Sequence, residues 1–384
     1  MRRSPDDWGI DAATKRQPRT TEGSTMTTLG ALVILYYPTD EQLSGLAALA
    51  RDSDALAVVD NTPQEHALAR ERVRALSSRA NVVWRHHGNR GGVAGAYNAG
   101  LSALFAQGID AVALFDQDST VPATFVARMR DTCARLGAGA FIAGPRIYDA
   151  NDRRFLPELM TNGVTVHRVR VEGETAPRRC AFLISSGSVI SRAAYAELGR
   201  FDEALFIDHV DTEYCLRALA RNVPLYVVPS LVLTHRIGAR RRHRVGPFEL
   251  TAMHHSWQRR YYGARNAMHL GLQYGLRFPV ALVPNLLTVW QVIQVVLCER
   301  EKGAKLRGIA LGVLDGLFGR LGSIEAARSG GAAGSPVRQR GAGQPESSSS
   351  PNEPRRDVMP DALRHEGEIT ARQPWNPAVD ETGR

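Results

Sequence analysis

The chain has 384 residues, of which 43% are hydrophobic and 23% charged. This length and composition exclude a small disulfide scaffold and a fully disordered protein, and they suffice for one large α/β domain with an appendage. The formal net charge of +9 identifies no partner by itself, because its meaning depends on where the charges lie. The 4 cysteines form no C-x-x-C pair, which argues against a zinc ribbon and favours a reducing compartment.

The two ends of the chain differ in composition from its middle. Residues 1–26 are polar and turn-rich and contain no apolar run, so we expect a disordered leader rather than a signal peptide. Residues 329–384 are dominated by Gly, Ala, Ser, Pro and mixed charges, which is typical of a disordered tail. The folded part is therefore expected between these two ends.

Strand-like and helical patterns alternate in the first half of the folded part. They predict strands at 29–36, 55–59, 81–85 and 111–115, and helices at 40–51, 63–78 and 93–106. Strands separated by helices imply βαβ units and a mostly parallel sheet. Ligands gather beyond the carboxyl ends of such strands, so the residues just after each apolar run are the first candidates for a site.

The second half is less regular and contains a long uncharged segment. Strands are predicted at 141–148, 182–190, 225–228 and 231–234, and a helix is predicted at 211–221. Residues 278–298 carry no charged side chain and are long enough to span a bilayer. Polar and helix-breaking residues make this segment a poor spanning helix, namely Pro284, Asn285, Gln291 and Gln294. Two alternatives follow: attachment at a membrane surface, or a core helix of a soluble protein.

Asp116 and Asp118 directly follow the predicted strand at 111–115. Two carboxylates at i and i+2 on a turn can converge on one divalent cation that bridges diphosphate oxygens. The alternative is that Asp118 caps the helix that begins near Pro122. His235, which follows another predicted strand, could complete a metal site with these carboxylates, although a lone histidine is more often structural.

Two further strand ends carry groups suited to a nucleotide. Asp60 and Asn61 could hydrogen-bond a nucleobase edge, or they could form an Asx turn. The loop before the helix at 93–106 contains Asn89, Arg90, Gly91 and Gly92. Its glycines could let backbone N–H groups approach a phosphate or sugar, or could serve only close helix packing. No G-x-G-x-x-G or G-K-[ST] sequence occurs, which argues against a Rossmann dehydrogenase and a P-loop enzyme.

Several carboxylates cluster where a loop is predicted to meet the helix at 211–221. A general base must lie at such an accessible position and must be ionised near neutral pH. Asp211 is the better candidate for this role, and Asp208 is the reserve. Helix capping is the common alternative role for acids at a helix start.

Residues 236–265 contain eight arginines and the single acid Glu249, so eight minus one, or +7, of the total of +9 lies there. These arginines suit a diphosphate donor or anionic lipid headgroups, and we expect Arg259 and Arg260 to bind the donor. No recognised nucleic-acid motif accompanies them, so no nucleic-acid partner is expected. A noncatalytic protein that binds nucleic acid or a membrane surface is the alternative from a different class.

In their order along the chain, these elements resemble the inverting family 2 glycosyltransferases with the GT-A fold, a Rossmann-like, mostly parallel sheet flanked by helices. More narrowly, the sequence resembles bacterial rhamnosyltransferases, in particular those that add the second rhamnose in di-rhamnolipid biosynthesis. The motifs that carry the resemblance lie at residues 87–90, 116–119, 144–147, 153–157, 182–187, 206–214, 235–238 and 259–262. The protein is then divided into a leader at 1–26, a GT-A domain at 27–270, a helical, membrane-associated segment at 271–328 and a tail at 329–384.

The resemblance implies a reaction and its participants. L-Rhamnose would pass from dTDP-L-rhamnose to the rhamnosyl group of a mono-rhamnolipid, with inversion at the anomeric carbon and with Mg²⁺ or Mn²⁺ as cofactor. A polyprenyl-linked O-antigen or another cell-surface polysaccharide precursor is the alternative acceptor. The implied location is the cytoplasmic face of the bacterial inner membrane, with peripheral attachment.

The resemblance also implies roles for individual residues. Asp60 would bind the thymine or its nucleoside, Asp116 and Asp118 the metal and diphosphate, and His235 the metal or diphosphate. Asp211 would be the base, and Asp208 could share this work, because Val210 stands where many relatives carry a Glu before the base. The Q-x-x-R-W motif of processive relatives is absent, which favours a single sugar transfer.

Overall fold

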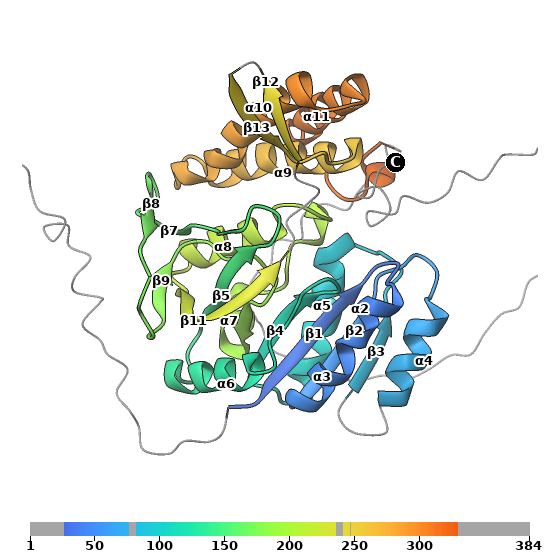
Figure 1. Cartoon of the computed structure of the whole chain (residues 1–384), viewed down its shortest axis with the longest axis vertical. Helices are drawn as coiled ribbons and strands as arrows, with labels where there is room; N and C mark the ends of the chain where they lie inside the picture. The colour runs from blue at the N-terminus through green and yellow to red at the C-terminus, as the bar shows by residue number, and fades with distance from the viewer. Residues whose placement is uncertain (1–26, 77–81, 236–240, 246, 329–384) are drawn as a thin grey trace, which may run out of the picture.

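The computed structural model describes residues 27–76, 82–235, 241–245 and 247–328, so the predicted leader and tail lie outside the described residues. Two parts are visible in Figure 1. The sheet domain, residues 27–235, is built on one large sheet flanked by helices. The helical region, residues 241–328, lies against it and consists of helices and one short hairpin.

One sheet runs through the sheet domain, with the strand order β3-β2-β1-β4-β10-β5-β11-β9 and with β6 paired to β5. Strands β1 to β5 and β11 run in one direction, whereas β6, β9 and β10 oppose them. The strand bounds are β1 Leu29–Leu35, β2 Ala55–Asp60, β3 Val82–His86, β4 Ala111–Asp116, β5 Ile142–Asp149, β6 Arg154–Phe155, β9 Arg178–Cys180, β10 Val189–Ser191 and β11 Leu225–His235. A separate hairpin joins β7 Glu158–Thr161 to β8 Val166–Val169. The predicted α/β class with a mostly parallel sheet flanked by helices is confirmed.

Helices cover both faces of this sheet. Because successive strand residues point to opposite faces, Leu32 and Ile34 of β1 join one apolar core and Ala31 and Val33 join the other. Helices α5, α7 and α8 close the first core, and α2, α3, α4 and α6 close the second. The helix bounds are α2 Asp40–Ser44, α3 Leu46–Asp52, α4 Ala67–Leu76, α5 Gly92–Ala106, α6 Phe125–Leu136, α7 Arg192–Leu198, η2 Glu203–Leu205 and α8 Val210–Ala220.

Some elements differ from the sequence prediction, each because of a local break. The helix expected after the first strand is two helices, α2 and α3, which meet at Gly45. Of the strand expected at 182–190, only β10 forms. The reason is a turn in which Gly187 adopts φ +78° and the Ser188 N–H donates to the Ser185 carbonyl (2.9 Å). The two short strands expected before residue 235 are one strand, β11, with a register shift in its middle.

The helical region is held together by a close contact between two helices. Its elements are β12 Arg241–Val245, β13 Phe248–Ala252, α9 Trp257–Tyr274, η3 Pro279–Leu282, α10 Val283–Cys298, α11 Lys302–Leu317 and α12 Ile324–Arg328. Gly308, Gly312 and Gly316 of α11 face α9, and a Cβ on Gly312 would overlap the Tyr261 carbonyl oxygen. Only glycine therefore allows the helices to lie this close. Because α9 packs on α11, we describe α9 with the helical region, and the predicted division of the chain at 271 stays a prediction.

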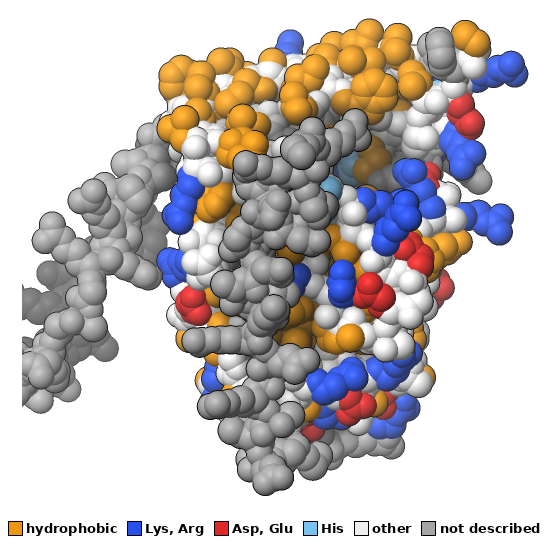
Figure 2. Space-filling view, turned by 90° about the vertical axis from the view of Figure 1, so that its left-hand side faces the viewer, with side chains coloured by type: hydrophobic (Ala, Val, Ile, Leu, Met, Phe, Trp, Pro, Cys, Tyr) orange, Lys and Arg blue, Asp and Glu red, His pale blue; other side chains and the backbone are white. Residues whose placement is uncertain are grey.

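The uncharged segment, η3 and α10, lies along the helical region. Its 20 residues, Pro279–Cys298, could cross a membrane by length and composition. Two of its polar side chains face the protein: Asn285 Nδ2 donates to the Ala267 carbonyl (2.8 Å) and Gln294 Nε2 to the Thr251 carbonyl (2.7 Å). The other side is apolar, and Figure 2 shows hydrophobic side chains gathered over this end of the molecule. The apolar face, as we call it, comprises the exposed Leu282, Val283, Leu286, Leu287, Val289, Trp290, Ile293, Val296, Leu297, Leu314, Leu317 and Phe318.

Candidate active site

In the loop after β4, Gln117 points to the end of β1, whereas Asp116 and Asp118 point to His235. Gln117 pairs with the end of β1, because its Oε1 accepts the Tyr36 N–H (2.7 Å) and its Nε2 donates to the Tyr36 carbonyl (3.0 Å). The flanking side chains, Asp116 and Asp118, lie near each other and near His235. The loop is thus fixed to the sheet by its middle residue, and its two carboxylates are presented together.

His235 ends β11 and lies beside these two carboxylates. An isolated bridge between Thr120 and Thr234 joins the loop after β4 to the end of β11. One potential ligand atom from each of Asp116, Asp118 and His235 lies within 4.8 Å of the others. The structure therefore brings together the three residues that the sequence analysis proposed as metal ligands.

The chemistry of this cluster fits a divalent cation. Nδ1 of His235 is buried and has no hydrogen-bond partner among the described residues. Burial and the neighbouring Asp118 raise the pKa of Asp116 to about 6, although His235 opposes the shift. Carboxylate oxygens suit Mg²⁺ and Mn²⁺, and an imidazole can add a further ligand. A cation held by these three side chains would offset the charge of two adjacent carboxylates.

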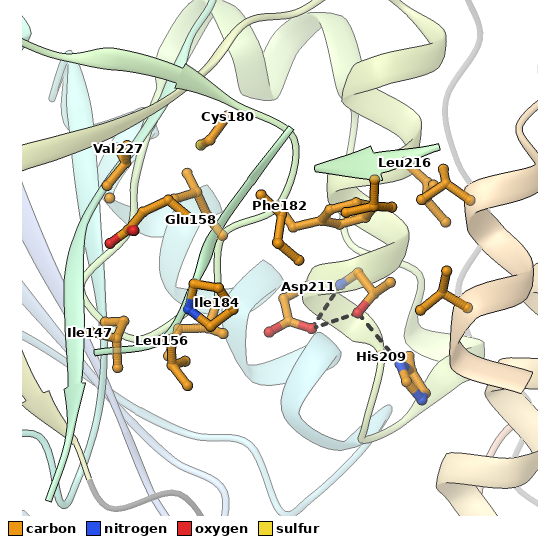
Figure 3. A pocket seen from close by; sticks show the side chains of 18 of the residues that line it. Ile147, Leu156, Glu158, Cys180, Phe182, Ile184, His209, Asp211, Leu216 and Val227 are labelled. Carbon is orange, nitrogen blue, oxygen red and sulfur yellow. Dashed lines mark hydrogen bonds between the residues drawn. The ribbon is translucent and has the colours of Figure 1, made fainter. Parts of the chain in front are cut away.

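Asp211 lies in the first turn of α8 and lines a cavity, where it is seen with His209 in Figure 3. Its Oδ1 accepts the Thr212 N–H (2.7 Å). Burial raises the pKa of Asp211, and the nearby His209 and hydrogen bonds from the Thr212 and Ser185 backbones offset only part of this rise. A carboxylate with a raised pKa is a better proton acceptor, which suits a general base.

Asp211 and the metal cluster border the same site. The charge of Asp211 contributes to the raised pKa of Asp116. Tyr97 interacts electrostatically with both carboxylates, and its hydroxyl donates to Asp116 Oδ1 (3.3 Å). Ser186, which lines the cavity, shares a hydrogen bond with Ser119 of the loop after β4 (2.7 Å between the two Oγ atoms).

Asp208, the reserve candidate for the base, has a different environment from Asp211. Arg259 of α9 grips it with two hydrogen bonds, from Nε to Oδ2 (2.9 Å) and from Nη2 to Oδ1 (2.6 Å). Burial favours the neutral form of Asp208, but the Arg259 guanidinium outweighs it and holds the pKa of Asp208 below its usual value. Asp208 is therefore engaged in an ion pair, whereas Asp211 faces the cavity.

The backbone around Asp208 is strained and is held from the helical region. Asp208 and His209 adopt positive φ angles of 61° and 58°, a conformation that costs free energy when a side chain is present. Asn266 of α9 stabilises this loop, because its Nδ2 lies within 2.8–2.9 Å of the carbonyl oxygens of Leu205, Ile207 and Asp208. α9 thus positions the segment that leads into Asp211.

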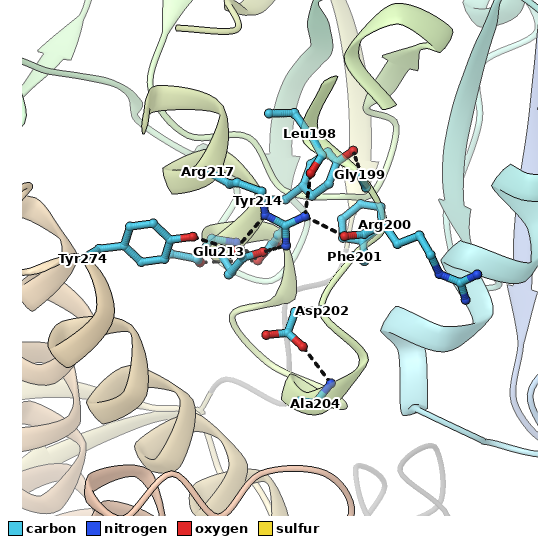
Figure 4. A network of polar contacts seen from close by, with 12 residues as sticks. Leu198, Gly199, Arg200, Phe201, Asp202, Ala204, Glu213, Tyr214, Arg217 and Tyr274 are labelled. Carbon is cyan, nitrogen blue, oxygen red and sulfur yellow. Dashed lines mark hydrogen bonds and ion pairs between the residues drawn. The ribbon is translucent and has the colours of Figure 1, made fainter. Parts of the chain in front are cut away.

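A polar network ties α8 to α9 and to the turn before η2 (Figure 4). The buried Glu213 accepts hydrogen bonds at Oε1 from Arg217 Nε (3.0 Å) and from the Tyr274 hydroxyl (2.8 Å). Arg217 Nη1 also donates to the carbonyls of Leu198 (3.1 Å) and Arg200 (2.6 Å). The helix that carries Asp211 is therefore anchored on both sides.

The glycine loop packs against η2 and the segment between η2 and α8. A Cβ on Gly92 would overlap the Phe206 carbonyl, so this position requires glycine for close packing as well as for its φ of +61°. Asn61 Nδ2 donates to Asn89 Oδ1 (3.0 Å) and to the Gly92 carbonyl (3.1 Å). That the donor is bound by this loop and by the neighbouring Asn61 stays a prediction, which concerns Asn61, Asn89, Arg90, Gly91 and Gly92.

Asp60 is fully buried at the end of β2. Its two carboxylate oxygens accept the backbone N–H groups of Thr62 (3.0 Å) and His66 (2.7 Å). This is the Asx-turn arrangement that was the alternative interpretation of Asp60-Asn61. The proposed contact of Asp60 with thymine stays a prediction.

The arginines of α9, of which Arg259 and Arg260 were expected to bind the donor, are engaged with other groups of the protein. Arg260 is buried in an ion pair with Glu299, and Arg265 is buried and donates to the Leu205 carbonyl (2.8 Å). The expected role of Arg260 at the donor therefore has no support from its position, and Arg259 is paired with Asp208. The sequence could not show this, because Glu299 lies 39 residues away along the chain.

Three more arginines of the stretch at 236–265 lie on the hairpin of the helical region. Arg241, Arg242 and Arg244 of β12 are exposed, and Arg242 pairs with Glu249 at 3.6 Å. Arg236 and Arg240 lie outside the described residues. Within the described residues, the positive charge that the sequence localised is thus divided between arginines of α9 that are bonded to neighbouring groups and an exposed hairpin.

The sequence analysis did not find the cavity, whose volume is about 380 Å³. Its lining comes from β5, from the segment of β6 to β8, from α8 and from η3 and α10, which are scattered along residues 144–287. The apolar run Phe182-Leu183-Ile184, which precedes a Ser-Ser-Gly turn, was the only local signal, and it was interpreted as part of a strand. Figure 3 shows Phe182 and Ile184 among the lining side chains.

Comparison with known proteins places this arrangement in a family. Residues 111–309 match the model of glycosyl transferase family group 2. Over 301 residues, 76% of this chain and 96% of the relative, the chain is 28% identical to dTDP-rhamnosyl transferase RfbF of Shigella flexneri. Among solved structures, S. aureus TarS 1–349 has a TM-score of 0.43 and 11% identity over 76% of this chain and 72% of that one. GalNAc-T7 with UDP, GalNAc and Mn²⁺ has a TM-score of 0.43 and 13% identity over 71% of this chain and 57% of that one. The family match includes Asp116, Asp211 and His235, and the chain belongs to glycosyl transferase family group 2 and is a glycosyltransferase.

Proposed function

We propose that the protein is an inverting rhamnosyltransferase that transfers L-rhamnose from dTDP-L-rhamnose to the rhamnosyl group of a mono-rhamnolipid, giving a di-rhamnolipid. The observation that carries this proposal is the position of Asp211, which lines an apolar cavity and whose charge acts on Asp116, a member of the cluster with Asp118 and His235. The similarity to a dTDP-rhamnosyl transferase supports the choice of donor.

The proposed reaction is a single displacement. Asp211 takes the proton of the acceptor hydroxyl while that oxygen forms a bond to the anomeric carbon, and the bond from this carbon to the diphosphate oxygen of dTDP breaks on the opposite side. Asp116, Asp118 and His235 would hold Mg²⁺ or Mn²⁺, which when bound would neutralise charge that develops on the diphosphate. Arg259 keeps Asp208 ionised and paired, so that Asp211 is the better placed of these two carboxylates to accept the proton.

The second candidate acceptor is a polyprenyl-linked O-antigen or cell-surface polysaccharide precursor. The similarity to RfbF of Shigella flexneri is equally consistent with this acceptor and with mono-rhamnolipid, because the name of that relative specifies a donor and no acceptor. Both candidate acceptors combine a sugar head with an apolar tail. The cavity beside Asp211 is compatible with either.

We further propose that the enzyme binds the cytoplasmic face of the bacterial inner membrane as a peripheral protein. The apolar face of α10 and α11 (Figure 2) supports this location, because exposed apolar side chains that gather on one face are typical of a membrane or protein contact. The inward contacts of Asn285 and Gln294 favour a helix that lies on the membrane surface over one that crosses it. The exposed arginines of β12 would add attraction to anionic lipids.

The test is a transfer assay with purified protein, dTDP-L-rhamnose and Mn²⁺ or Mg²⁺. Mono-rhamnolipid and a polyprenyl-diphosphate-linked saccharide are supplied separately, and products are identified by mass spectrometry. We expect di-rhamnolipid, and we expect a chelator to abolish its formation. Product from the polyprenyl acceptor alone would select the alternative, and no rhamnosylated product from either acceptor would contradict the proposed function.

A further inference from the structure

The cavity beside Asp211 has an apolar wall to which both parts of the molecule contribute. Phe182 and Leu216 belong to the sheet domain, whereas Val280, Val283 and Leu287 belong to η3 and α10. Its volume of about 380 Å³ falls in the range of small-molecule sites, which are commonly lined by hydrophobic side chains with a few polar groups. The cavity can therefore receive an apolar group next to the proposed base.

The charged groups at the other side of the cavity neutralise each other. Arg146 Nε donates to Glu158 Oε1 (2.8 Å), and both side chains are almost fully buried. The Arg146 guanidinium also lies over the Phe155 ring, 4.1 Å from its centre. Figure 3 shows the Glu158 carboxylate on the side of the cavity opposite Leu216. The Arg146–Glu158 pair therefore gives the cavity lining no net charge that would disfavour an apolar group.

Two residues of α10 connect the cavity to the apolar face. Val283 and Leu287, one helical turn apart, line the cavity and are still 39% and 51% exposed. Leu286 and Trp290 continue the exposed apolar surface along the same helix. An apolar chain could therefore pass from this surface into the cavity without crossing a charged side chain of α10, which has none.

We propose that the cavity binds the apolar tail of an amphiphilic acceptor, which enters over Val283 and Leu287 while the sugar head reaches Asp211. This inference rests on the proposed function for the identity of the sugar head. It adds a binding site and a route: the part of the acceptor nearest its sugar is held by protein, and the rest of the tail lies along the apolar face. The class of ligand is a single glycoside with an alkyl or acyl aglycone.

The direct test is equilibrium binding of a series of alkyl α-L-rhamnosides, from methyl to dodecyl, to the full-length protein below their micellar concentrations. Isothermal titration calorimetry gives the dissociation constant Kd for each. Burial of one methylene corresponds to a gain of about threefold to fourfold in affinity. We expect Kd to fall by about this factor per added methylene and then to level off once the cavity is filled. A Kd that does not depend on chain length would overturn the inference.

Matched variants on α10 separate the cavity from the rest of the apolar face. Val283→Asp places a charge at the cavity entrance, whereas Val289→Asp places the same charge on the same helix at an exposed residue that does not line the cavity. We expect V283D to weaken octyl rhamnoside binding at least tenfold and to leave methyl rhamnoside binding within twofold. V289D should change neither. Equal effects of the two variants on octyl rhamnoside would contradict the proposed entrance.

A cavity-filling variant tests the interior independently of the entrance. Leu156→Trp adds volume at a partly exposed lining residue, and it should shorten the chain length at which Kd levels off. Binding of dTDP-L-rhamnose serves as the check that each variant is folded. If the wild-type protein shows the chain-length dependence but transfers no rhamnose, the proposed function fails and the cavity assignment stands. If it transfers rhamnose with Kd independent of chain length, only the cavity assignment fails.

Discussion

The sheet domain and the helical region both bury charged residues, but they differ in the side chains that they leave accessible. The sheet domain buries aliphatic strands and presents Asp116, Asp118 and Asp211 at strand and helix ends around a site. The helical region buries charged residues, Arg260, Arg265, Glu299, Lys305 and Asp315, and exposes the apolar face. The difference indicates that the two parts have different roles. In the proposed function, the sheet domain supplies the reacting groups and the helical region offers a surface for apolar surroundings.

The two parts are nevertheless joined through the base. α9 contributes Arg259, which pairs with Asp208, and Asn266, which holds the strained loop before Asp211. The buried charges of the helical region are therefore also relevant to catalysis, because they keep α9 in place. Substitution of these buried charges should lower the stability of the protein, and activity should fall as a consequence of that loss.

The largest expected effect on stability comes from removing the shared partner of the buried charges. Glu299 binds Arg260 and Lys305, with Lys305 Nζ 3.0 Å from Oε2. Glu299→Ala would leave two buried cations unpaired and should lower the free energy of unfolding by about 3–5 kcal/mol. Arg70→Ala, which breaks the exposed Arg70–Glu65 pair, is the control and should cost less than about 1 kcal/mol. Equal losses in denaturant titrations would contradict the burial of Glu299 between two cations.

A smaller loss is expected where α11 meets α9. Gly312→Ala would place a Cβ against the Tyr261 carbonyl and should cost about 1–3 kcal/mol of stability. Gly303, in the same helix, has no neighbour within 4 Å of an added Cβ. Gly303→Ala should therefore stabilise the protein, by about 0.5–1 kcal/mol, because alanine favours the helix. Thermal unfolding of both variants checks the opposite signs, and a stabilising Gly312→Ala would show that the helices do not touch as described.

The pH dependence of transfer distinguishes the two carboxylates at the start of α8. Asp211 must be ionised to accept a proton, and its pKa is raised by burial. The rate should therefore fall as the pH is lowered, by about tenfold per pH unit below a midpoint that lies above about 3.9, the ordinary value for an aspartate. Asp208→Asn should leave this midpoint unchanged, because Arg259 keeps Asp208 ionised over the same range. A midpoint that shifted in the Asp208→Asn variant would contradict the assignment of this titration to Asp211.

The smallest effect concerns the exposed hairpin arginines. Arg244→Gln should weaken binding to vesicles that contain anionic lipid by about 1 kcal/mol, or about fivefold, and should have no effect with neutral vesicles. Cosedimentation at low and high salt measures this change. An equal loss with both vesicle types would mean that Arg244 acts other than through lipid charge.

Much of the sheet domain could be predicted from the sequence, because its apolar strands and their polar ends follow local patterns. The turn at Gly187 was missed because Phe182 to Ile184 are as apolar as a strand. Asp116, Asp118 and His235 were correctly expected to lie together, since the ends of parallel strands meet at one edge of a sheet.

The helical region was less predictable, because long-range pairing decides which charges are exposed. Arg260 has the local sequence of a surface arginine, and only the fold places Glu299 against it. The uncharged segment left two alternatives open, and the side chains of Asn285 and Gln294 show which side of α10 faces the protein. The cavity was missed because its lining residues come from elements more than 100 residues apart.

The most direct test of the central claim is the turnover of Asp211→Asn in the transfer assay, with the Kd of dTDP-L-rhamnose measured in parallel. Loss of a general base lowers kcat by about 10²–10⁴-fold. We predict a loss in this range with donor binding within twofold of the wild type. Undiminished turnover of Asp211→Asn would contradict the account.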